Sequence, residues 1–461
     1  MTHETTTESR SGSGRTADIN ARLDRLPAWG LHPAVYVVLG MCYLLAFYDI
    51  AVIGIALPRI SDSLHLTGSD ESLPITLNLI GYIIGAYGLG NVADALGRRK
   101  TLAIVMILLA VSSVLTAASW NTATLSVFRF LAGVGIGAQI TLSATLIGEF
   151  APASSRGRYL ARNIVWAAVG NIVPAVLAIP LLRIPGAAGW RTLFALSACV
   201  VLLLALFRDR ILPESPRWLA AHGQLDRAER VVVAMEQRNR ARLGGELPDP
   251  VPVPGEELGG GFPTSALFRR PFAGRLAVVL SFWFVLYFAV YAFLAYQTTL
   301  LGDLHAKLPS SVVVTAIGFA GGVAGAAVQP LFIDRIERRT SVIAGLVVFV
   351  AGFILLAAAN GPVLITIGSF LASMGLFLTL VPAYAYTAEI FPTRARAAAM
   401  GVGDGLGHAG GAVQPYIVVP LLAAAGARPV FWMMAAVAAL AIVIMLFALR
   451  TSRRPLTELS Q

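Results

Sequence analysis

Charged residues and cysteine are both scarce in this sequence. Only 13% of its 461 residues are charged, whereas 57% are hydrophobic, and the mean hydropathy is +0.74. Soluble chains carry about 25% charged residues, so the composition excludes an ordinary soluble protein. Both cysteines, Cys42 and Cys199, lie in apolar runs, which excludes a disulfide framework and a cysteine metal cluster. The composition predicts an all-α integral membrane protein.

A signal peptide and the motifs of enzymes are also missing. Residues 1–33 are polar and have no short apolar core, so we expect a disordered cytoplasmic tail there. No phosphate loop, nucleophile triad or metal-ligand cluster is visible, and "GVGIG" (133–137) lies within an apolar run. We expect no enzyme, no catalytic residue, no metal and no cofactor, with protons as the coupling ion. The net charge of +10 reflects arginine-rich loops rather than a nucleic-acid partner.

Long apolar runs are what the sequence has in abundance. A span needs roughly 20 mostly apolar residues, and twelve runs qualify. They cover 34–58, 75–96, 101–119, 122–150, 158–182, 189–208, 273–301, 312–334, 341–359, 361–389, 397–424 and 429–449. Most of the 35 lysines and arginines lie in alternate loops, so the positive-inside rule places both termini and the long central loop in the cytoplasm.

The central loop divides the runs into two sets of six. We predict a six-helix bundle over 34–208, a cytoplasmic linker loop over 209–272, a second six-helix bundle over 273–449 and a cytoplasmic tail over 450–461. Within the linker loop, 227–243 has the pattern of an amphipathic surface helix. The segment 248–261 is a proline- and glycine-rich linker.

The two halves repeat residues at an offset of 240. Asp94, Arg98, Arg99, Gly135, Glu149 and Arg156 match Asp334, Arg338, Arg339, Gly375, Glu389 and Arg396. So many matches at one offset indicate a duplication. Two pseudo-symmetric bundles suit alternating access, in which the halves rock about a central cavity.

Several motifs resemble those of the major facilitator superfamily. They are "GNVADALGRRK" (90–100), "RFLAGVGIGAQ" (129–139) followed by "EFAPASSRGR" (149–158), "PESPRWL" (213–219) and "EIFPTRARA" (389–397). The "PESPRWL" motif is similar to a sugar-porter signature, and 392–415 looks more like the organic-acid, niacin and organic-ion branches. The resemblance covers the whole chain and implies a monomeric transporter of small molecules in the lipid bilayer, built on the fold of that superfamily.

Two opposite charges lie inside apolar runs. Asp49 in the first run and Arg129 in the fourth lie at similar depth, because the two runs cross in opposite directions at about 1.5 Å per residue. The positions 240 residues later hold Ala289 and Ser369, so the pair is not part of the repeated scaffold. Sugar porters carry a similar pair, and the resemblance implies proton coupling. A static ion pair that fixes helix packing is the alternative.

Other polar groups in the runs are candidates for substrate binding. Asp404 and His408 are spaced i,i+4 on one helix face, and Tyr287 and Tyr291 share a face of the seventh run. These tyrosines could stack on a ring-bearing substrate. Gln139 and Gln297 complete the set. For each residue, ordinary packing or a satisfied hydrogen bond is the alternative.

The loop motifs supply candidates for a cytoplasmic gate. They are Gly90, Asp94, Gly97, Arg98, Arg99, Glu149 and Arg156, with Asp334, Arg338, Arg339, Glu389, Arg394 and Arg396 in the second half. Gly90 would allow close helix contact, and the charges would pair across the halves when the inner side closes. The arginines could instead serve only as topology signals.

These patterns together predict a proton symporter that imports an aromatic or other organic acid. A sugar or polyol is the second substrate class. It ranks below the organic acid because the seventh and tenth runs lack the sugar-binding elements that sugar porters usually carry. The residues also leave open a drug/proton antiporter and a non-transporting nutrient sensor. The bias toward alanine, arginine and glycine indicates a bacterial inner membrane.

Overall fold

The computed structural model describes residues 4–207, 211–250, 264–304, 308–332, 335–391 and 393–449, which form helices and no strands. The first half contains α2 (Pro33–Leu64), α3 (Ser69–Leu96), α4 (Arg98–Ala117), α5 (Thr122–Phe150), η1 (Ala153–Ser155), α6 (Arg156–Leu181), α7 (Ala188–Ser197) and η2 (Ala198–Leu206). The second half contains α10 (Ala273–Asp303), α11 (Leu308–Val328), η4 (Gln329–Leu331), α12 (Arg338–Ala358), α13 (Pro362–Glu389), α14 (Thr393–Val413), α15 (Pro415–Ala425) and α16 (Ala427–Leu446). The remaining helices are α1 (Glu4–Asp24), α8 (Pro216–Ala221), α9 (Leu225–Leu243) and η3 (Thr264–Phe268).

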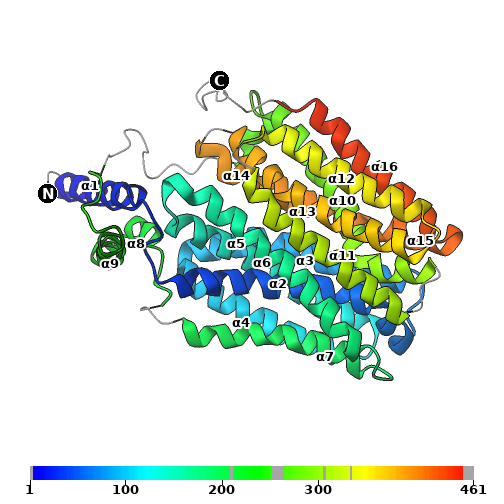
Figure 1. Ribbon diagram of the computed structural model, residues 1–461. Helices are drawn as coiled ribbons and strands as arrows, with labels where there is room; N and C mark the ends of the chain where they lie inside the picture. The colour runs from blue at the N-terminus through cyan, green and yellow to red at the C-terminus, as the bar shows by residue number, and fades with distance from the viewer. Residues whose placement is uncertain are drawn as a thin grey trace.

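The prediction of twelve membrane spans is confirmed. In the described part of the chain, twelve helical segments are long and apolar enough to cross a bilayer. The span over 188–206 combines α7 with the 3-10 helix η2, and α14 gives way to α15 at Pro415. The first half, from blue to bluish green, and the second half, from light green through yellow to red, lie beside each other with their spans running in a common direction (Figure 1).

The sequence repeat is visible in the packing of the two halves. A Cβ built at Gly81 would lie 2.2 Å from the carbonyl oxygen of Phe130, and one at Gly321 would lie 2.1 Å from that of Phe370. Both pairs are related by the offset of 240 residues. Each glycine therefore brings two helices of its own half into backbone contact, as small residues do between membrane helices.

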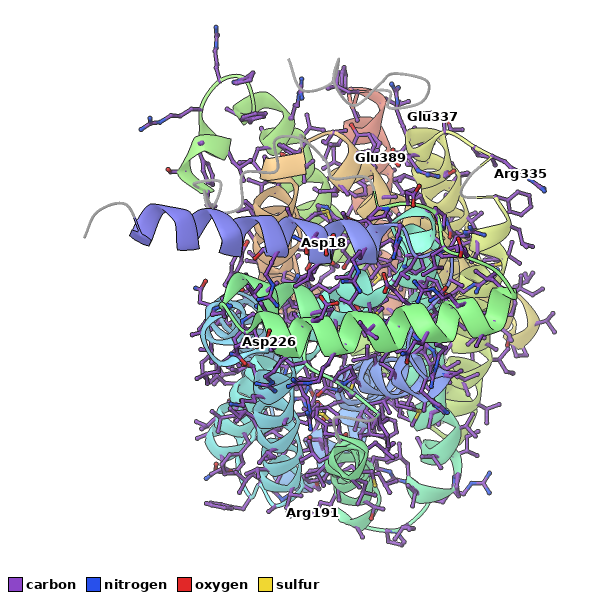
Figure 2. The ribbon with its side chains drawn as sticks, turned by 90° about the vertical axis from the view of Figure 1, so that its left-hand side faces the viewer. Asp18, Arg191, Asp226, Arg335, Glu337 and Glu389 are labelled. Atoms are coloured by element: carbon purple, nitrogen blue, oxygen red, sulfur yellow. The ribbon has the colours of Figure 1, made fainter. Side chains whose placement is uncertain are left out.

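The N-terminal segment differs from the prediction of a disordered tail. Residues 4–24 form α1, which lies with α8 and α9 beyond the ends of the spans, and Figure 2 shows α1 and α9 crossing that face together. Arg22 donates to both carboxylate oxygens of Glu236 at 3.0 and 2.8 Å, and Arg25 adds a bond at 2.5 Å. Burial disfavours the charge on Glu236, but these arginines outweigh it and lower its pKa.

The linker loop agrees in part with its prediction. The amphipathic helix expected over 227–243 is confirmed as α9. The greater part of the 248–261 linker and the whole 450–461 tail lie outside the described residues. We call the end of the molecule that carries α1, α8 and α9 the α9 end, and the other the opposite end.

The two halves meet at the opposite end. A Cβ at Gly54 of α2 would lie 2.1 Å from the carbonyl oxygen of Leu294 in α10, so these backbones touch. The hydroxyl of Thr76 in α3 donates to the carbonyl of Ala412 in α14 at 2.9 Å. Both contacts join one half to the other, which closes the molecule on this side.

Candidate functional site

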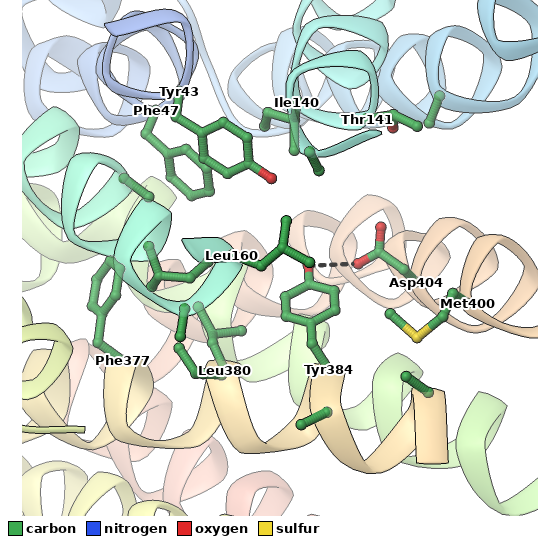
Figure 3. A pocket seen from close by; sticks show the side chains of 18 of the residues that line it. Tyr43, Phe47, Ile140, Thr141, Leu160, Phe377, Leu380, Tyr384, Met400 and Asp404 are labelled. Atoms are coloured by element: carbon green, nitrogen blue, oxygen red, sulfur yellow. Dashed lines mark hydrogen bonds between the residues drawn. The ribbon is translucent and has the colours of Figure 1, made fainter. Parts of the chain in front are cut away.

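A cavity of about 750 Å³ lies between the two halves. Its walls include Tyr43 and Phe47 of α2 on one side and Phe377, Leu380 and Tyr384 of α13 on the other (Figure 3). The lining extends to helix ends at the α9 end, where it takes in Ser154, Arg158, Arg338 and Glu389. Because the opposite end is closed, the cavity faces the α9 end.

Asp404 of α14 places a carboxylate in this cavity against two tyrosines. The hydroxyls of Tyr287 and Tyr384 both donate to Asp404 Oδ1, the second at 2.8 Å, and they lie 2.9 Å from each other. Figure 3 shows the bond between Asp404 and Tyr384. Three helices of the second half therefore join in one polar cluster at the cavity wall.

His408 joins the two halves through its ring. The ring centroids of Tyr82 in α3 and Tyr287 in α10 each lie 4.0 Å from that of His408. Its Nδ1 lies 2.6 Å from the backbone oxygen of Asp404. A carbonyl oxygen only accepts, so Nδ1 carries the hydrogen in this contact. The imidazole is thereby held in one orientation between aromatic faces.

Of the remaining residues predicted to bind substrate, one lines the cavity and two do not. Tyr291, like Tyr287, Asp404 and His408, lines the cavity. Gln139 does not; its Nε2 donates to the backbone oxygen of Cys42 at 2.6 Å and ties α5 to α2. Gln297 donates to the hydroxyl of Ser369 at 2.6 Å, also away from the lining. Both glutamines act in helix packing in this conformation.

Asp49 and Arg129 form a fully buried ion pair. Both side chains are 0% exposed, and Arg129 Nη1 donates to Asp49 Oδ1. The hydroxyl of Ser113 donates to Asp49 Oδ2 at 3.0 Å, and the guanidinium lies 5.2 Å from the ring centroid of Phe194. Helices α2, α4, α5 and α7 thus meet at this pair. Arg129 Nε and Nη2 find no acceptor among the described residues.

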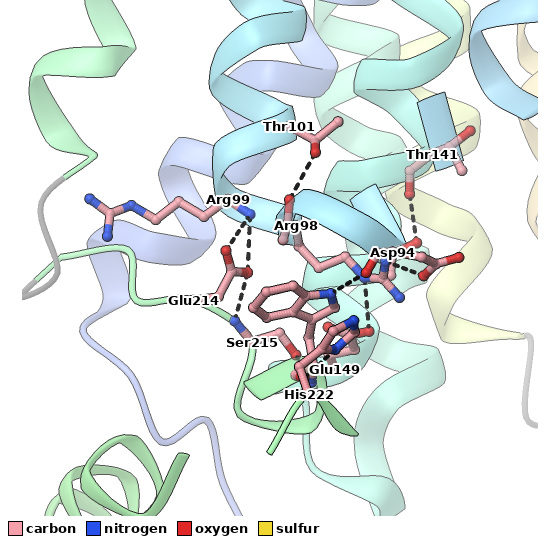
Figure 4. Close-up of polar contacts among 12 residues, drawn as sticks. Asp94, Arg98, Arg99, Thr101, Thr141, Glu149, Glu214, Ser215 and His222 are labelled. Atoms are coloured by element: carbon pink, nitrogen blue, oxygen red, sulfur yellow. Dashed lines mark hydrogen bonds and ion pairs between the residues drawn. The ribbon is translucent and has the colours of Figure 1, made fainter. Parts of the chain in front are cut away.

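The first-half gate residues form a network at the α9 end (Figure 4). Arg98 pairs with Asp94 and, at 3.5 Å, with Glu149. These contacts lie within the first half. The pairing predicted for Asp94, across the halves when the inner side closes, stays a prediction, because the cavity is open at the α9 end in this conformation. A Cβ at Gly90 would meet no atom within 4 Å in the described part of the chain, so no close helix contact is made there in this conformation.

Glu214 of the "PESPRWL" motif holds the turn between α3 and α4. Its carboxylate accepts from the backbone N–H of Arg99 at 3.1 and 3.2 Å and from that of Ser215 at 3.0 Å (Figure 4). Gly97 has a φ of 103° and would place a Cβ 2.4 Å from Glu214 Oε2, so only glycine fits this turn. The loop motif and the linker loop therefore form one structural unit.

The other gate residues also pair away from the opposite half. Arg338 donates to Glu389 at 2.9 Å, which repeats the Arg98–Glu149 pair at the offset of 240, and Arg339 donates to backbone oxygens of Leu446 and Ala448. Arg156 contacts Asp24 of α1 at 3.2 Å. Asp334 lies outside the described residues, and the structure does not describe the side chains of Arg394 and Arg396.

Four residues of these clusters were not predicted from the sequence. Tyr82 and Tyr384 line the cavity, Ser113 binds Asp49, and Glu214 caps α4. Tyr384 precedes Glu389 in an apolar run and Ser113 lies among apolar residues, so neither carries a motif. Glu214 does belong to the "PESPRWL" motif. A carboxylate at this position of the motif is the sequence feature that could have indicated its role.

A family model for the Major Facilitator Superfamily matches residues 39–415 and 292–461. The chain belongs to this superfamily. This major facilitator is 25% identical over 449 residues to the inner membrane metabolite transport protein YdjE of Escherichia coli (strain K12), with 96% of this chain and 98% of YdjE covered. It is 23% identical to the niacin transporter NiaP of Acinetobacter baylyi, with 96% and 99% covered.

Solved structures confirm the fold of this major facilitator. The xylose transporter XylE of E. coli in a partially occluded inward-open conformation superimposes with a TM-score of 0.72 at 19% identity, covering 91% of this chain and 98% of XylE. An inward-open form of XylE gives a TM-score of 0.70 at 21% identity. The protein is thus a multi-pass membrane transporter with the twelve-helix fold, and its relatives are transporters rather than enzymes.

Proposed function

We propose that this transporter is a proton-coupled symporter that imports a small ring-bearing organic solute, with an aromatic organic acid as the first substrate class. In this proposal the α9 end is cytoplasmic, the described conformation is inward-facing, and the protein lies in a bacterial inner membrane as a monomer. The Asp49–Arg129 pair carries the proposal, because it is a charge pair fully buried between two membrane spans, α2 and α5.

The coupling follows from the geometry of the pair. A proton on Asp49 removes the negative charge that holds Arg129, and α2 is then released from α5 at that level. Two Arg129 nitrogens already find no acceptor in the described structure, so the guanidinium gains by taking new partners once released. Protonation drives transport only if it stabilises one orientation more than the other. Because α2 also touches α10 at Gly54, a shift of α2 reaches the contact between the halves.

The cavity supports a ring-bearing solute. Its volume of about 750 Å³ is in the range of small-molecule sites. Tyr82, Tyr287, Tyr291 and Tyr384 offer aromatic faces and hydroxyl groups. Arg158 at the mouth would attract an anion, whereas Arg338 is paired there with Glu389. The likeness to a niacin transporter agrees with this class, since niacin is an aromatic acid.

An organic cation is the second candidate class. Asp404 stands among tyrosine rings, and a carboxylate with aromatic faces is an arrangement that suits a cation.

Solved relatives described as proton:xylose symporters agree with proton symport, but their likeness establishes the fold alone. A sugar would need hydroxyl contacts that the tyrosines can offer.

Uptake by proteoliposomes tests the proposal. Purified protein is reconstituted with an outward-alkaline or an outward-acid pH gradient, and radiolabelled benzoate, nicotinate, a quaternary aromatic amine and xylose are compared. We expect accumulation of one aromatic substrate only when the outside is acid. Accumulation under the reversed gradient would indicate antiport, and binding of a substrate without any accumulation would indicate a sensor.

A further inference from the structure

A second cavity lies outside the transport site, at the junction of the linker loop and α2. It has a volume of about 320 Å³. Its lining consists of Gly30, Leu31, His32, Ile211, Pro213, Glu214, Leu219, Arg227, Arg230, Val231, Ala234 and Arg238. Nothing in the proposed transport mechanism uses this cavity.

One face of α9 supplies its positive charge. Arg227, Arg230, Val231, Ala234 and Arg238 follow the spacing i, i+3, i+4, i+7 and i+11, which places them within an arc of roughly 100° at 100° per residue. The three arginines are thus aligned along the cavity, separated by small apolar side chains. Other residues of α9, Val232, Met235 and Glu236, occupy another face and are buried.

The acids of α9 do not neutralise these arginines. Asp226 pairs with Arg15 at 2.9 Å, and Glu229 pairs with Arg22 at 2.6 Å, so both are engaged with α1. Arg227 donates to Gln224, and neither Arg230 nor Arg238 has an ion-pair partner in the described ranges. Three exposed arginines therefore line one cavity without an ion pair to a carboxylate of their own helix.

The carboxylate of Glu214, which also lines the cavity, makes no ion pair with these arginines in the described structure. It accepts from two backbone N–H groups, that of Arg99 with both oxygens and that of Ser215 with one, at the start of α4 and α8. The rest of the wall is apolar, with Leu31, Ile211 and Leu219. His32 stands directly before α2, where its Nδ1 accepts from the N–H of Ala34 at 3.2 Å. The cavity therefore lies at the level where the first span enters the membrane.

We propose that this cavity binds a phosphate-bearing anion. Guanidinium groups bind phosphate oxygens through charge-assisted, often bidentate, hydrogen bonds. The apolar wall beside the arginines and the position at the membrane boundary suit a phospholipid headgroup, and a free phosphate compound offers the same chemistry. A bound phosphate would link α9 to the start of α2 and to the segment that holds the α3–α4 turn, and so stabilise the linker loop on the first half.

The test compares two phosphate sources on the full-length protein. In one arm, nanodiscs of phosphatidylcholine receive phosphatidylglycerol in steps; in the other, protein in neutral detergent receives inorganic phosphate at constant ionic strength, with chloride as reference. Thermal unfolding gives an apparent affinity in each arm. We expect stabilisation of the wild type by phosphatidylglycerol, by phosphate or by both, and the responding arm identifies the source.

Paired variants connect the response to the cavity. Arg230→Gln with Arg238→Gln is expected to weaken the apparent affinity about tenfold for each lost arginine. Arg240→Gln, on another face of α9, is the matched control and keeps the wild-type response. If exposed glutamines lower the basal stability, Arg230→Lys with Arg238→Lys retains the charge and should respond in between. An unresponsive wild type, or equal responses of the double variant and the control, would overturn the proposal.

Discussion

At the scale of single residues, Asp49 and Arg129 are fully buried charges that pair with each other. Asp49 accepts from Arg129 and Ser113, and the guanidinium lies over Phe194. A buried charge is tolerated only with its partner. Removing one member of the pair should therefore destabilise the folded protein more than removing both.

Arg129→Met tests this dependence. It leaves Asp49 buried without its cation, and we expect a loss of about 3–5 kcal/mol relative to wild type, measured as a lower midpoint of thermal unfolding in detergent. The double variant Asp49→Leu, Arg129→Met should recover much of that loss, because no charge remains. Equal destabilisation by the single and double variants would show that the ion pair does not determine stability at this site.

Asp404→Asn tests the cavity at the same scale. The amide keeps the shape but removes the charge that the Tyr287 and Tyr384 hydroxyls bind. For an aromatic acid we expect tighter binding, and for an organic cation at least tenfold weaker binding, since a charged hydrogen bond contributes about 1.5–3 kcal/mol. Isothermal titration of benzoate and of an aromatic amine measures both, with Asp62→Asn, an exposed change away from the cavity, as a control for general charge effects.

Some of these residues could be predicted from the sequence and others could not. Asp49 and Arg129 are conspicuous because an ionised group in an apolar run needs a partner, and helix rise gives its depth. Ser113 and Tyr384 become partners only through tertiary packing, which no local pattern encodes. Gln139 shows the converse: a polar side chain in a span can satisfy a backbone carbonyl and never reach the cavity.

At the scale of elements, the spans were predictable and the N-terminal helix was not. A stretch such as α5 is bounded by its apolar pattern and begins with the Asn121–Thr124 capping box. α1 is rich in serine, threonine and glycine and has little intrinsic helix preference. It is held by partners more than 200 residues away, chiefly Glu236 and Asp226 of α9, and such partners are invisible in the local sequence.

Glu236→Gln tests the docking of α1. The change removes the charge that Arg22 and Arg25 bind, so we expect faster amide hydrogen exchange throughout α1 while the spans stay protected. Arg240→Gln on the same helix is the control. Unchanged protection of α1 would contradict this role of the carboxylate.

The same contact predicts a pH dependence. The pKa of Glu236 is lowered from 4.5 in the folded protein, so its contribution to docking is complete above about pH 4.5. That contribution is lost as the pH falls through the lowered pKa. Hydrogen exchange of α1 should therefore accelerate in acid beyond its intrinsic pH dependence in the wild type. In Glu236→Gln this additional acceleration should be absent.

At the scale of the whole molecule, closure at the opposite end depends on backbone contact between the halves. Gly54→Trp would place a large side chain where Leu294 lies, so we expect the halves to stay apart there and the cavity to close at the α9 end. A cysteine introduced at Ala161, which lines the cavity, should then react more slowly with an impermeant thiol reagent in inside-out vesicles. The labelling is measured in a Cys199→Ser background, because Cys199 is the exposed native thiol and Cys42 is buried.

Gly148→Trp is the matched control for this wedge. A Cβ at Gly148 meets no atom within 4 Å of the described structure, so the labelling rate should stay at the wild-type value. Equal rates in the Gly54 variant and this control would mean that the contact at Gly54 does not hold the opposite end shut.

The proposed transport cycle depends above all on the buried carboxylate of α2 as the proton site that drives accumulation. A comparison of wild type, Asp49→Asn and Asp62→Asn, an exposed change on the same helix, in proteoliposomes tests this assignment. We predict that Asp49→Asn loses accumulation driven by an acid exterior, so that internal and external substrate equalise, while exchange of labelled for unlabelled substrate continues within a few-fold of wild type. Gradient-driven accumulation by Asp49→Asn at the level of wild type and Asp62→Asn would contradict it.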